Sequence, residues 1–434
     1  MDLKMKKDNK IQWIGENKLS WEIVRAKYIF RNKSSKNHIG EELLSVNQKE
    51  GVIRRSELDV KVWNPSEDIS GYKLVENGNF IISLRSFEGG LELSKIRGLV
   101  SPAYTVLEKI QEVDNNFFWW MMKSNQFIVE LNKHVSGIRQ GKNIGWDDFS
   151  NIYLLKPPYQ EQKKISAYLD KKTKQIDSLI GKIEKKIELL KEQKTALINQ
   201  YVTKGLDLNI QMKDSGVDWI GEIPSEWRMT KIKYLSSVEL STIDRHQYKE
   251  ENRVKICHYP EAYKNEYISK LTELSSGTCS DYEFEKYSLK KNDILLTKDS
   301  ESPDDIGIPT FVSEDLDNTV CGYHLSQIRI NNKLILPEFL YRFLESKSTK
   351  DYFFISSNGI TRYGLGKSSI QNLLIIFPTK DLQIKIIKKI KDLSKFTENS
   401  TLLLKNKIVL LKEYRQSLIS SIVTGKIGIT EDMT

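Results

Sequence analysis

The sequence has few of the residues that build metal centres or disulfide frameworks. It contains three cysteines, Cys257, Cys279 and Cys321, without a paired spacing, and five histidines that form no metal-ligand spacing with one another or with the cysteines. These absences exclude a disulfide scaffold and a zinc module, so we expect no metal site. Unpaired cysteines are typical of a reducing compartment, and we expect a cytoplasmic protein.

Long apolar runs are also missing. The longest ones, such as residues 117–122, are far shorter than the roughly 20 residues that cross a bilayer. No basic segment followed by an apolar segment opens the chain. We therefore expect no membrane partner. A content of 39% hydrophobic and 29% charged residues in a chain of 434 indicates a globular protein of two or three domains.

Catalytic signatures are absent as well. Residues 156–159 (KPPY) are similar to the Asn/Asp-Pro-Pro-Tyr/Phe signature of amino-methyltransferases, but a lysine at position 156 cannot accept the hydrogen bond of a target amine. Residues 364–368 (GLGKS) are similar to a phosphate-binding loop, but Thr361 stands where that motif needs glycine. Asp304 and Glu345 are too distant in sequence to indicate a nuclease carboxylate cluster. We predict no catalytic residue, no bound cofactor, and neither methylation nor cleavage of DNA by the chain alone.

Positive charge is what the sequence does have. Its 67 Lys and Arg residues exceed its 58 Asp and Glu residues, and the net charge is +9. Such a balance favours a polyanionic partner, although a basic face that is merely solvated is the alternative. The distribution of the basic residues has to decide between the two.

The strongest pattern is a repeated long helix. Residues 187–203 and 408–424 are identical at nine of seventeen positions, at an offset of 221 (411 − 190). The offset holds back to the prolines at positions 157 and 378, and a glycine follows each segment, at positions 205 and 425. Proline near the start and glycine after the end are typical helix boundaries. We therefore predict long helices over 157–205 and 378–425.

Shorter repeats accompany the helices. Residues 13–21 and 219–227 each place two tryptophans eight residues apart, which favours a structural staple at a domain entrance. The remaining repeats pair residues 78–86 with 292–300, 100–104 with 320–324, 117–124 with 339–346, and the glycine-led loops 137–143 with 359–367.

These repeats indicate a tandem duplication of one unit, a globular domain followed by a long helix. We predict an α+β protein with two tandem α/β domains and two long helices that form an antiparallel coiled coil between them. The alternative is that each helix packs on its own domain. The expected segments are the domains 1–156 and 218–377, the helices 157–205 and 378–425, the linker 206–217 and the tail 426–434.

Apolar residues in both helical segments recur at steps of three and four, which is typical of a coiled-coil seam. We expect these residues to pair the two helices. They are Ile165, Leu169, Ile183, Ile187, Leu190 and Leu197 in the first segment and Ile386, Ile390, Leu404, Ile408, Leu411 and Leu418 in the second.

Five segments, taken together, are similar to one known family. They are residues 219–227, 157–162, 189–203, 100–104 and 293–298. In these the chain resembles, over nearly its whole length, the specificity subunit of type I restriction and modification systems. One departure from the family pattern is an asparagine at position 79, where the second repeat has an aspartate at position 293.

The resemblance implies two target recognition domains, each reading one half of a split, asymmetric sequence in double-stranded DNA. It also implies paired helices that act as a spacer and dock two modification subunits. Those partners would carry S-adenosylmethionine and methylate adenine, and restriction subunits would add translocation and cleavage with ATP and Mg2+. This chain would be a non-catalytic subunit. The alternatives are a coiled-coil scaffold without base reading, and a catalytic DNA methyltransferase or nuclease.

Basic and amide side chains on loops are the usual readers of base edges in a DNA groove. The two glycine-led loops are densest in such residues, and two further basic residues follow the matched β-rich runs. The alternative is that these loops only close the domains. The candidates are Arg85, Arg139, Gln140, Lys142, Lys298, Arg362, Tyr363 and Lys367.

Overall fold

The computed structural model describes residues 11–430 apart from 12, 16–18, 20, 49, 59–68, 135–143 and 208. It divides into two compact units: unit 1 comprises Met1–Lys185 and Leu404–Thr434, and unit 2 comprises Lys186–Leu403. Each unit contains a segment of both long helices, α5 (Tyr159–Thr203) and α11 (Lys380–Val423). None of the helices in the described ranges is both long enough and apolar enough to cross a bilayer.

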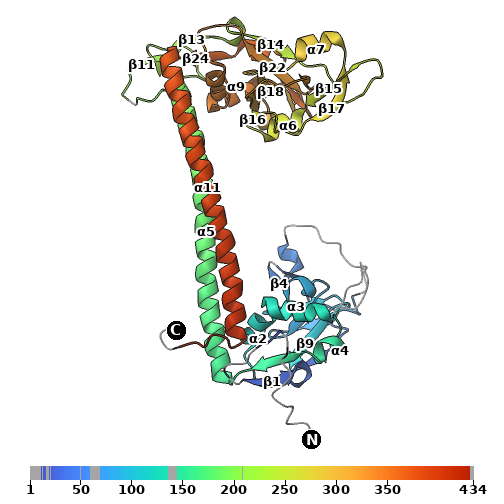
Figure 1. Cartoon of the computed structure of the whole chain (residues 1–434). Helices are drawn as coiled ribbons and strands as arrows, with labels where there is room; N and C mark the ends of the chain where they lie inside the picture. The colour runs from blue at the N-terminus through green and yellow to red at the C-terminus, as the bar shows by residue number, and fades with distance from the viewer. Residues whose placement is uncertain are drawn as a thin grey trace. The chain divides into compact units, whose positions relative to one another are not determined.

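Unit 1 is built on a four-stranded antiparallel sheet with the order β2-β9-β6-β7. Phe80 of β6 pairs with Leu107 of β9, and both are fully buried. Three strand pairs, β1-β10, β3-β4 and β5-β8, add to the β-structure that the described residues of the unit form, and Figure 1 labels β1, β4 and β9. The strands are β1 (Glu22–Arg25), β2 (Phe30–Lys33), β3 (Leu44–Asn47), β4 (Gly51–Arg54), β5 (Lys73–Val75), β6 (Phe80–Ile82), β7 (Glu92–Leu93), β8 (Gly98–Val100), β9 (Thr105–Lys109) and β10 (Tyr153–Lys156).

Two of the short helices of unit 1 begin at side chains that cap them. Asp114 accepts a hydrogen bond from the backbone N–H of Phe117 at 2.8 Å, and Ser124 accepts one from Phe127 at 3.4 Å. Such caps satisfy N–H groups that have no partner inside a helix. Phe117 and Phe127 then lie in the apolar core with the sheet. The helices are α1 (Ser86–Gly89), α2 (Asn115–Met122), α3 (Asn125–Lys133) and α4 (Trp146–Ser150), with 3-10 turns η1 (Ala26–Tyr28) and η2 (Arg55–Glu57).

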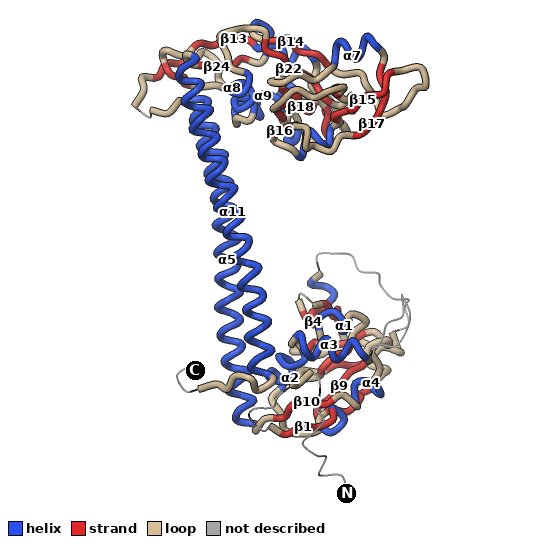
Figure 2. Tube along the Cα trace, viewed as in Figure 1, coloured by secondary structure: helices blue, strands red, loops and turns tan. Residues whose placement is uncertain are grey.

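Unit 2 carries a larger set of strands, drawn in red in Figure 2. A five-stranded sheet has the order β14-β22-β18-β20-β16, and a three-stranded sheet has the order β17-β15-β21. The pairs β11-β12, β13-β24 and β19-β23 complete it. The strands are β11 (Met212–Asp214), β12 (Glu222–Pro224), β13 (Arg228–Lys231), β14 (Ser236–Leu240), β15 (Asn252–Cys257), β16 (Tyr267–Ile268), β17 (Ser275–Cys279), β18 (Ile294–Thr297), β19 (Asp299–Ser300), β20 (Pro309–Val312), β21 (Thr319–Cys321), β22 (Leu325–Ile330), β23 (Tyr363–Gly364) and β24 (Leu374–Phe377).

The helices of unit 2 repeat those of unit 1 in part. Both α8 and α2 follow the last strand of the main sheet, and both are followed at once by a second helix. The bounds are α6 (Tyr259–Lys264), α7 (Asp281–Tyr287), α8 (Pro337–Leu344), α9 (Lys347–Ser356) and α10 (Lys367–Asn372), with 3-10 turns η3 (Ile232–Tyr234) and η4 (Pro303–Asp305).

The two units share one arrangement of paired strands, which we call the frame. The order β2-β9-β6 in unit 1 matches β14-β22-β18 in unit 2, and the pair β1-β10 matches β13-β24. In each unit the last strand of that pair, β10 or β24, leads directly into a long helix. The sequence repeats that fall on these strands are therefore repeats of structure.

One sequence alignment needs correction, that of residues 100–104 with 320–324. The turn before β9 is closed by a hydrogen bond from Tyr104 N to Ser101 O at 3.0 Å, and the turn before β22 by one from Leu325 N to Gly322 O at 3.1 Å. Tyr104 therefore corresponds to Leu325 rather than to His324, and the offset here is 221 (325 − 104). The sequence alone placed the match one residue off, because no identical polar residue marks the turn.

The long helices α5 and α11 lie within the intervals that the prolines and glycines predicted, and they pack together. In unit 1, Ile165 and Leu169 of α5 share a core with Ile422 of α11. In unit 2, Val202 of α5 shares a core with Ile386 of α11. Each unit thus buries a segment of both helices.

The predicted seam residues all lie on protected faces of these helices. None of the twelve is exposed, which is what an inward-facing apolar stripe requires. Those that are buried are Ile165, Leu169, Ile183, Ile187, Ile386, Ile390 and Leu418, and those that are half-buried are Leu190, Leu197, Leu404, Ile408 and Leu411.

Tryptophans seal the C-terminal ends of both helices. A Cβ added to Gly425 would lie 3.3 to 3.5 Å from the ring of Trp21, and one added to Gly205 would lie 3.3 Å from the ring of Trp227. Gly425 and Gly205 have φ angles of +68° and +87°, which glycine adopts without strain. The rings of Trp21 and Trp227 are buried, in agreement with the interpretation of the tryptophan pairs as staples.

A buried glutamine joins each long helix to its preceding domain. Gln383 accepts from Leu336 N at 2.8 Å and donates to the carbonyls of Leu334 and Pro378, both at 2.9 Å. Gln162 repeats this, because its amide accepts from Asp114 N at 2.9 Å and donates to the carbonyl at position 157 at 2.7 Å. The amide supplies an acceptor and donors together, which explains its presence at both repeats.

We expect Gln383→Ala to destabilise unit 2 by about 1 to 3 kcal/mol, because it leaves the buried N–H of Leu336 and two carbonyl groups without their partner. The measurement is the midpoint of urea unfolding. Lys385→Ala is the control: its side chain is exposed on the same helix turn, and such changes stay within about 0.5 kcal/mol. Equal midpoints for the two variants would contradict the role of Gln383.

Candidate nucleic-acid interface

Unit 1 contains four of the eight residues predicted to read DNA. Arg139, Gln140 and Lys142 lie outside the described residues. Arg85 is exposed and stands directly before α1. The other four candidates belong to unit 2, where the structure decides which of them are neighbours.

A short strand pair brings the segment after β18 beside the glycine-led loop of unit 2. Asp299 of β19 lies opposite Gly364 of β23, and Ser300 lies opposite Tyr363. Next to this pair, the carbonyl of Lys298 accepts a hydrogen bond from the backbone N–H of residue 365 at 2.7 Å. Two candidate segments that are far apart in sequence therefore form one surface.

Lys298 is a half-buried cation in fixed surroundings. Its Nζ lies 4.5 Å from the centroid of the Tyr323 ring and donates a hydrogen bond to the carbonyl of Ser241 at 3.2 Å. Burial lowers the pKa of Lys298, and the neighbouring Asp299 acts in the opposite direction. The aromatic face and the carbonyl together hold the ammonium group at the base of the surface.

His324 lies between a carboxylate and a guanidinium group. Its Nδ1 is 2.9 Å from Oδ2 of Asp299 and 3.1 Å from Nη2 of Arg362. A ring nitrogen that donates a proton to the carboxylate cannot also accept one from the guanidinium, so these two contacts exclude each other. When Nδ1 donates to Asp299, Nε2 lies 3.5 Å from the same Nη2 and can accept from the exposed Arg362.

Two tyrosines of α6 add an aromatic rim. The rings of Tyr259 and Tyr263 are stacked, with centroids 5.5 Å apart and an interplanar angle of 14°. The Tyr263 hydroxyl donates to Oδ1 of Asp305 at 2.9 Å, and the residue is 42% exposed. Burial raises the pKa of Tyr259, while a side-chain hydrogen bond with Ser300 and the charge of Arg362 oppose this shift.

Lys367 and Tyr363 make contacts within the domain. Nζ of Lys367 lies 3.0 Å from both carboxylate oxygens of Glu239. Tyr363 is half-buried and packs against the apolar core of unit 2. Of the four candidates in unit 2, Lys298 and Arg362 therefore lie at this surface. Lys367 is ion-paired with Glu239.

Sequence reasoning missed Tyr323 and His324. They hold the two central positions of the turn 322–325, where the corresponding turn of unit 1 has Pro102 and Ala103. The signal that identifies them is this difference between the repeats at a turn whose flanking strands are matched.

The surface combines two cations, an imidazole and stacked aromatic rings. Arginine and lysine suit phosphates and guanine edges, and aromatic rings suit base or sugar faces. In the part of the chain that the structure describes, no group of three or more His, Cys, Asp or Glu side chains could hold a metal ion. These groups have the chemistry that a nucleic-acid ligand requires.

Comparison with known proteins points in the same direction. Residues 224–409 match the family model of the type I restriction modification DNA specificity domain. The specificity subunit of the type I restriction enzyme MjaVIII from Methanocaldococcus jannaschii is 24% identical over 370 residues, which are 83% of this chain and 82% of that subunit.

Two solved structures share the fold. The HsdS subunit from Thermoanaerobacter tengcongensis matches with a TM-score of 0.57 and 11% identity, over 94% of this chain and 97% of that one. A chain from a structural study of complex assembly and conformational transition in a type I R-M system matches with a TM-score of 0.66 and 13% identity, over 94% and 98%.

Proposed function

The chain belongs to the specificity subunits of type I restriction-modification systems, and we propose that each of its units reads one half of a bipartite, asymmetric DNA target. One observation carries this proposal: a shared frame in both units presents different side chains at the same turn. Unit 1 has Pro102 and Ala103 there, and unit 2 has Tyr323 and His324. Two units that share a frame but present different side chains to DNA would read different half-sites.

We further propose that α5 and α11 form an antiparallel coiled coil that separates the half-sites and docks two modification subunits. Support comes from a second apolar set on α11, outside the predicted seam. Phe396 and Leu403 in unit 2 are 63% and 69% exposed, and Leu410 and Tyr414 in unit 1 are 64% and 56% exposed. Three of these four recur at a spacing of seven, which suits a partner helix.

The catalytic chemistry belongs to the partners in this proposal. The chain is non-catalytic and binds no cofactor of its own. Modification subunits use S-adenosylmethionine, and restriction subunits use ATP and Mg2+. The assembly works in the cytoplasm, where its DNA is.

The test of the proposed function is selection of bound duplexes from a random pool by the purified full-length chain. We expect two short enriched sequences of different composition, separated by a gap of fixed length without preference. Binding without enrichment would favour a coiled-coil scaffold. Methyl transfer to the pool with only S-adenosylmethionine added would favour a methyltransferase.

We expect Arg362→Ala to cost about 1 to 3 kcal/mol at one base pair of one half-site, because an arginine that contacts a base edge is worth that much. Affinities for single-base variants of the selected duplex measure this. Lys367→Ala is the control, because its charge is already paired with Glu239. Uniform weakening by Arg362→Ala across all duplexes would mark a phosphate contact instead.

In this proposal the length of the two helices sets the length of the gap between the half-sites. α5 has 45 residues and α11 has 44, or about 67 Å of helix at 1.5 Å per residue. An added heptad extends a helix by about 10 Å, which is roughly three base pairs. A copy of residues 183–189 inserted after 189, together with a copy of 404–410 inserted after 410, keeps the apolar spacing in both helices.

We expect this doubly lengthened chain to select the same two half-sites with a gap longer by about three base pairs. Selection from the random pool measures the gap. The control carries only one of the two insertions; it breaks the register between the helices and should lose affinity. An unchanged gap, or changed half-sites, would show that the helices do not set the spacing.

A further inference from the structure

Each unit has a loop that leaves the frame beside the turn before β9 or β22. In unit 1 this loop is 34–43, between β2 and β3, and in unit 2 it is 241–251, between β14 and β15. The registers of β2 with β9 and of β14 with β22 place Ser35 and Ser241 at corresponding positions, at an offset of 206 (241 − 35). The two loops therefore start at the same point of the frame but differ in length and sequence.

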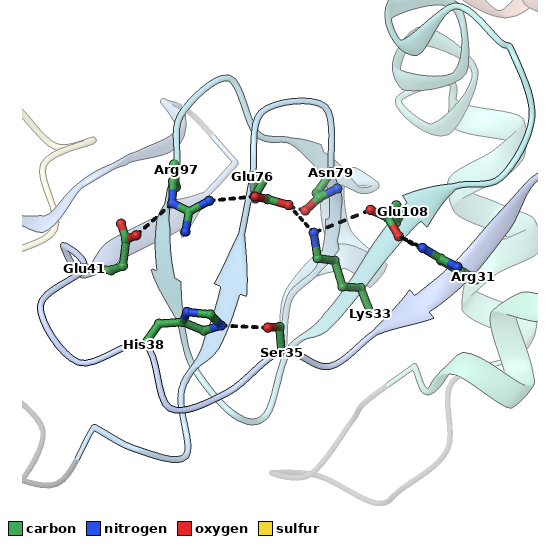
Figure 3. A network of polar contacts seen from close by, with 9 residues as sticks. All are labelled: Arg31, Lys33, Ser35, His38, Glu41, Glu76, Asn79, Arg97 and Glu108. Atoms are coloured by element: carbon green, nitrogen blue, oxygen red, sulfur yellow. Dashed lines mark hydrogen bonds and ion pairs between the residues drawn. The ribbon is translucent and has the colours of Figure 1, made fainter.

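Contacts at both ends fix the loop of unit 1. The carbonyl of Ser35 accepts a hydrogen bond from Leu74 N at 2.8 Å, and its hydroxyl lies 2.7 Å from Nε2 of His38. Nε of Arg97 donates to Oε1 of Glu41 at 2.7 Å, as Figure 3 shows. These contacts hold the loop beside β5 and β8.

The ionic network of Figure 3 neutralises the cations next to this loop, because Lys33 and Arg97 both contact Glu76. Asn37 projects from the loop itself. It is exposed, its φ is +63°, which asparagine tolerates, and its backbone N–H donates to Ser70 O at 3.1 Å. Its side-chain amide has no hydrogen-bond partner among the described residues, so a donor and an acceptor are free together.

Two contacts fix the loop of unit 2. Tyr323 N donates to the carbonyl of the buried Ile243 at 2.7 Å. Oδ1 of Asp244 accepts from His246 N at 2.8 Å, and its Oδ2 lies 2.9 Å from Nδ1 of the same residue. Arg245 stands between these two residues and is exposed, and its guanidinium group has no ion-pair or hydrogen-bond partner in the described ranges.

The other basic and amide side chains of the two loops are less suited to a base edge. The lysines present a single ammonium group, which suits a phosphate better than the paired groups of a base. The remaining side chains already make contacts within their own unit. They are His38, His246 and Gln247.

We propose that Asn37 and Arg245 read base edges, Asn37 in the half-site of unit 1 and Arg245 in the half-site of unit 2. This deepens the proposed function and rests on it. The asparagine amide matches the donor and the acceptor that adenine presents in the major groove, and the guanidinium group matches the two acceptors of guanine. Asn37 therefore specifies an A·T pair, and Arg245 specifies a G·C pair.

The test is selection of duplexes from a random pool by the full-length chain, followed by affinity measurements on single-base variants of the selected duplex. We expect Asn37→Gly to lose a discrimination of about 5- to 150-fold at one A·T pair of one half-site. Glycine replaces Asn37 because it adopts a positive φ without strain. We expect Arg245→Ala to lose as much at one G·C pair of the other half-site. In each variant the unaffected half-site is the control for folding.

Each variant also has a matched control. Asn32→Ala removes the same amide from an exposed position on β2, and Lys249→Ala removes the same charge from the loop that carries Arg245. Both controls should leave the preference at every base pair unchanged. A control that shifts the preference at the same base pair as its partner variant would overturn the assignment.

Arg245→Lys separates base reading from charge. It retains the positive charge but lacks the planar pair of donors that fits guanine. We expect this variant to bind a random-sequence duplex as tightly as the unaltered chain does, and to lose the preference for the G·C pair. A retained preference would overturn the role of Arg245.

Three results would contradict the inference while the proposed function stands. Unchanged preference in Asn37→Gly or Arg245→Ala would remove that residue from the site. Equal weakening on all duplexes would mark a phosphate contact instead of a base contact. Changes by both variants within one half-site would overturn the assignment of one loop to each unit. If the unaltered chain enriches no sequence from the pool, the proposed function itself fails, and this inference fails with it.

Discussion

Each globular part of this chain completes its core with a helix end that belongs to the other repeat. In unit 1 the sheet residues pack with Ile419 and Val423 at the end of α11. In unit 2 they pack with Ile198 and Val202 at the end of α5. Burial of these side chains supplies roughly 1.5 to 3 kcal/mol each, so neither unit reaches its stability from its own repeat alone. The tryptophan seals at Gly205 and Gly425 follow from the same constraint, because each ring covers a helix end contributed by the other repeat.

Where a buried residue of the frame differs in charge between the two units, its hydrogen-bond partners differ as well. Asp293 is buried and accepts hydrogen bonds from Arg329 at 2.8 and 2.7 Å and from Gln327 at 2.7 Å. The strand registers place Glu108 at the position of Arg329, so a carboxylate at position 79 of unit 1 would face another carboxylate. Asn79 instead accepts from the backbone N–H of Glu76 at 2.9 Å and carries no charge. The departure from the family pattern at position 79 is thus a matched replacement, since a buried carboxylate needs a cation.

The sequence revealed the repeated helices because their evidence is local: proline and glycine mark the ends, and apolar residues recur over many turns. It also identified Lys298 and Arg362 as basic loop residues. It could not show that the two pack around His324, because strands of two residues, such as β19 and β23, have no readable periodicity and their pairing is decided by tertiary contacts. For the same reason the sequence could not show that Lys367 pairs with Glu239 on a distant strand. The position of Arg139, Gln140 and Lys142 stays a prediction.

The positions that stabilise this fold are buried, and the turn positions that differ between the two units are exposed. Phe80 and its counterpart Ile294 are fully buried and paired in matching registers, so a change at either position would cost packing energy. Pro102 and Ala103 are exposed, and Tyr323 at the matching turn is 46% exposed, so a change at these positions leaves the core untouched. Substitutions of that kind usually alter stability by less than about 0.5 kcal/mol. Two copies of one frame can therefore keep their apolar positions while their turns diverge, and divergence of the turns is what an asymmetric target requires.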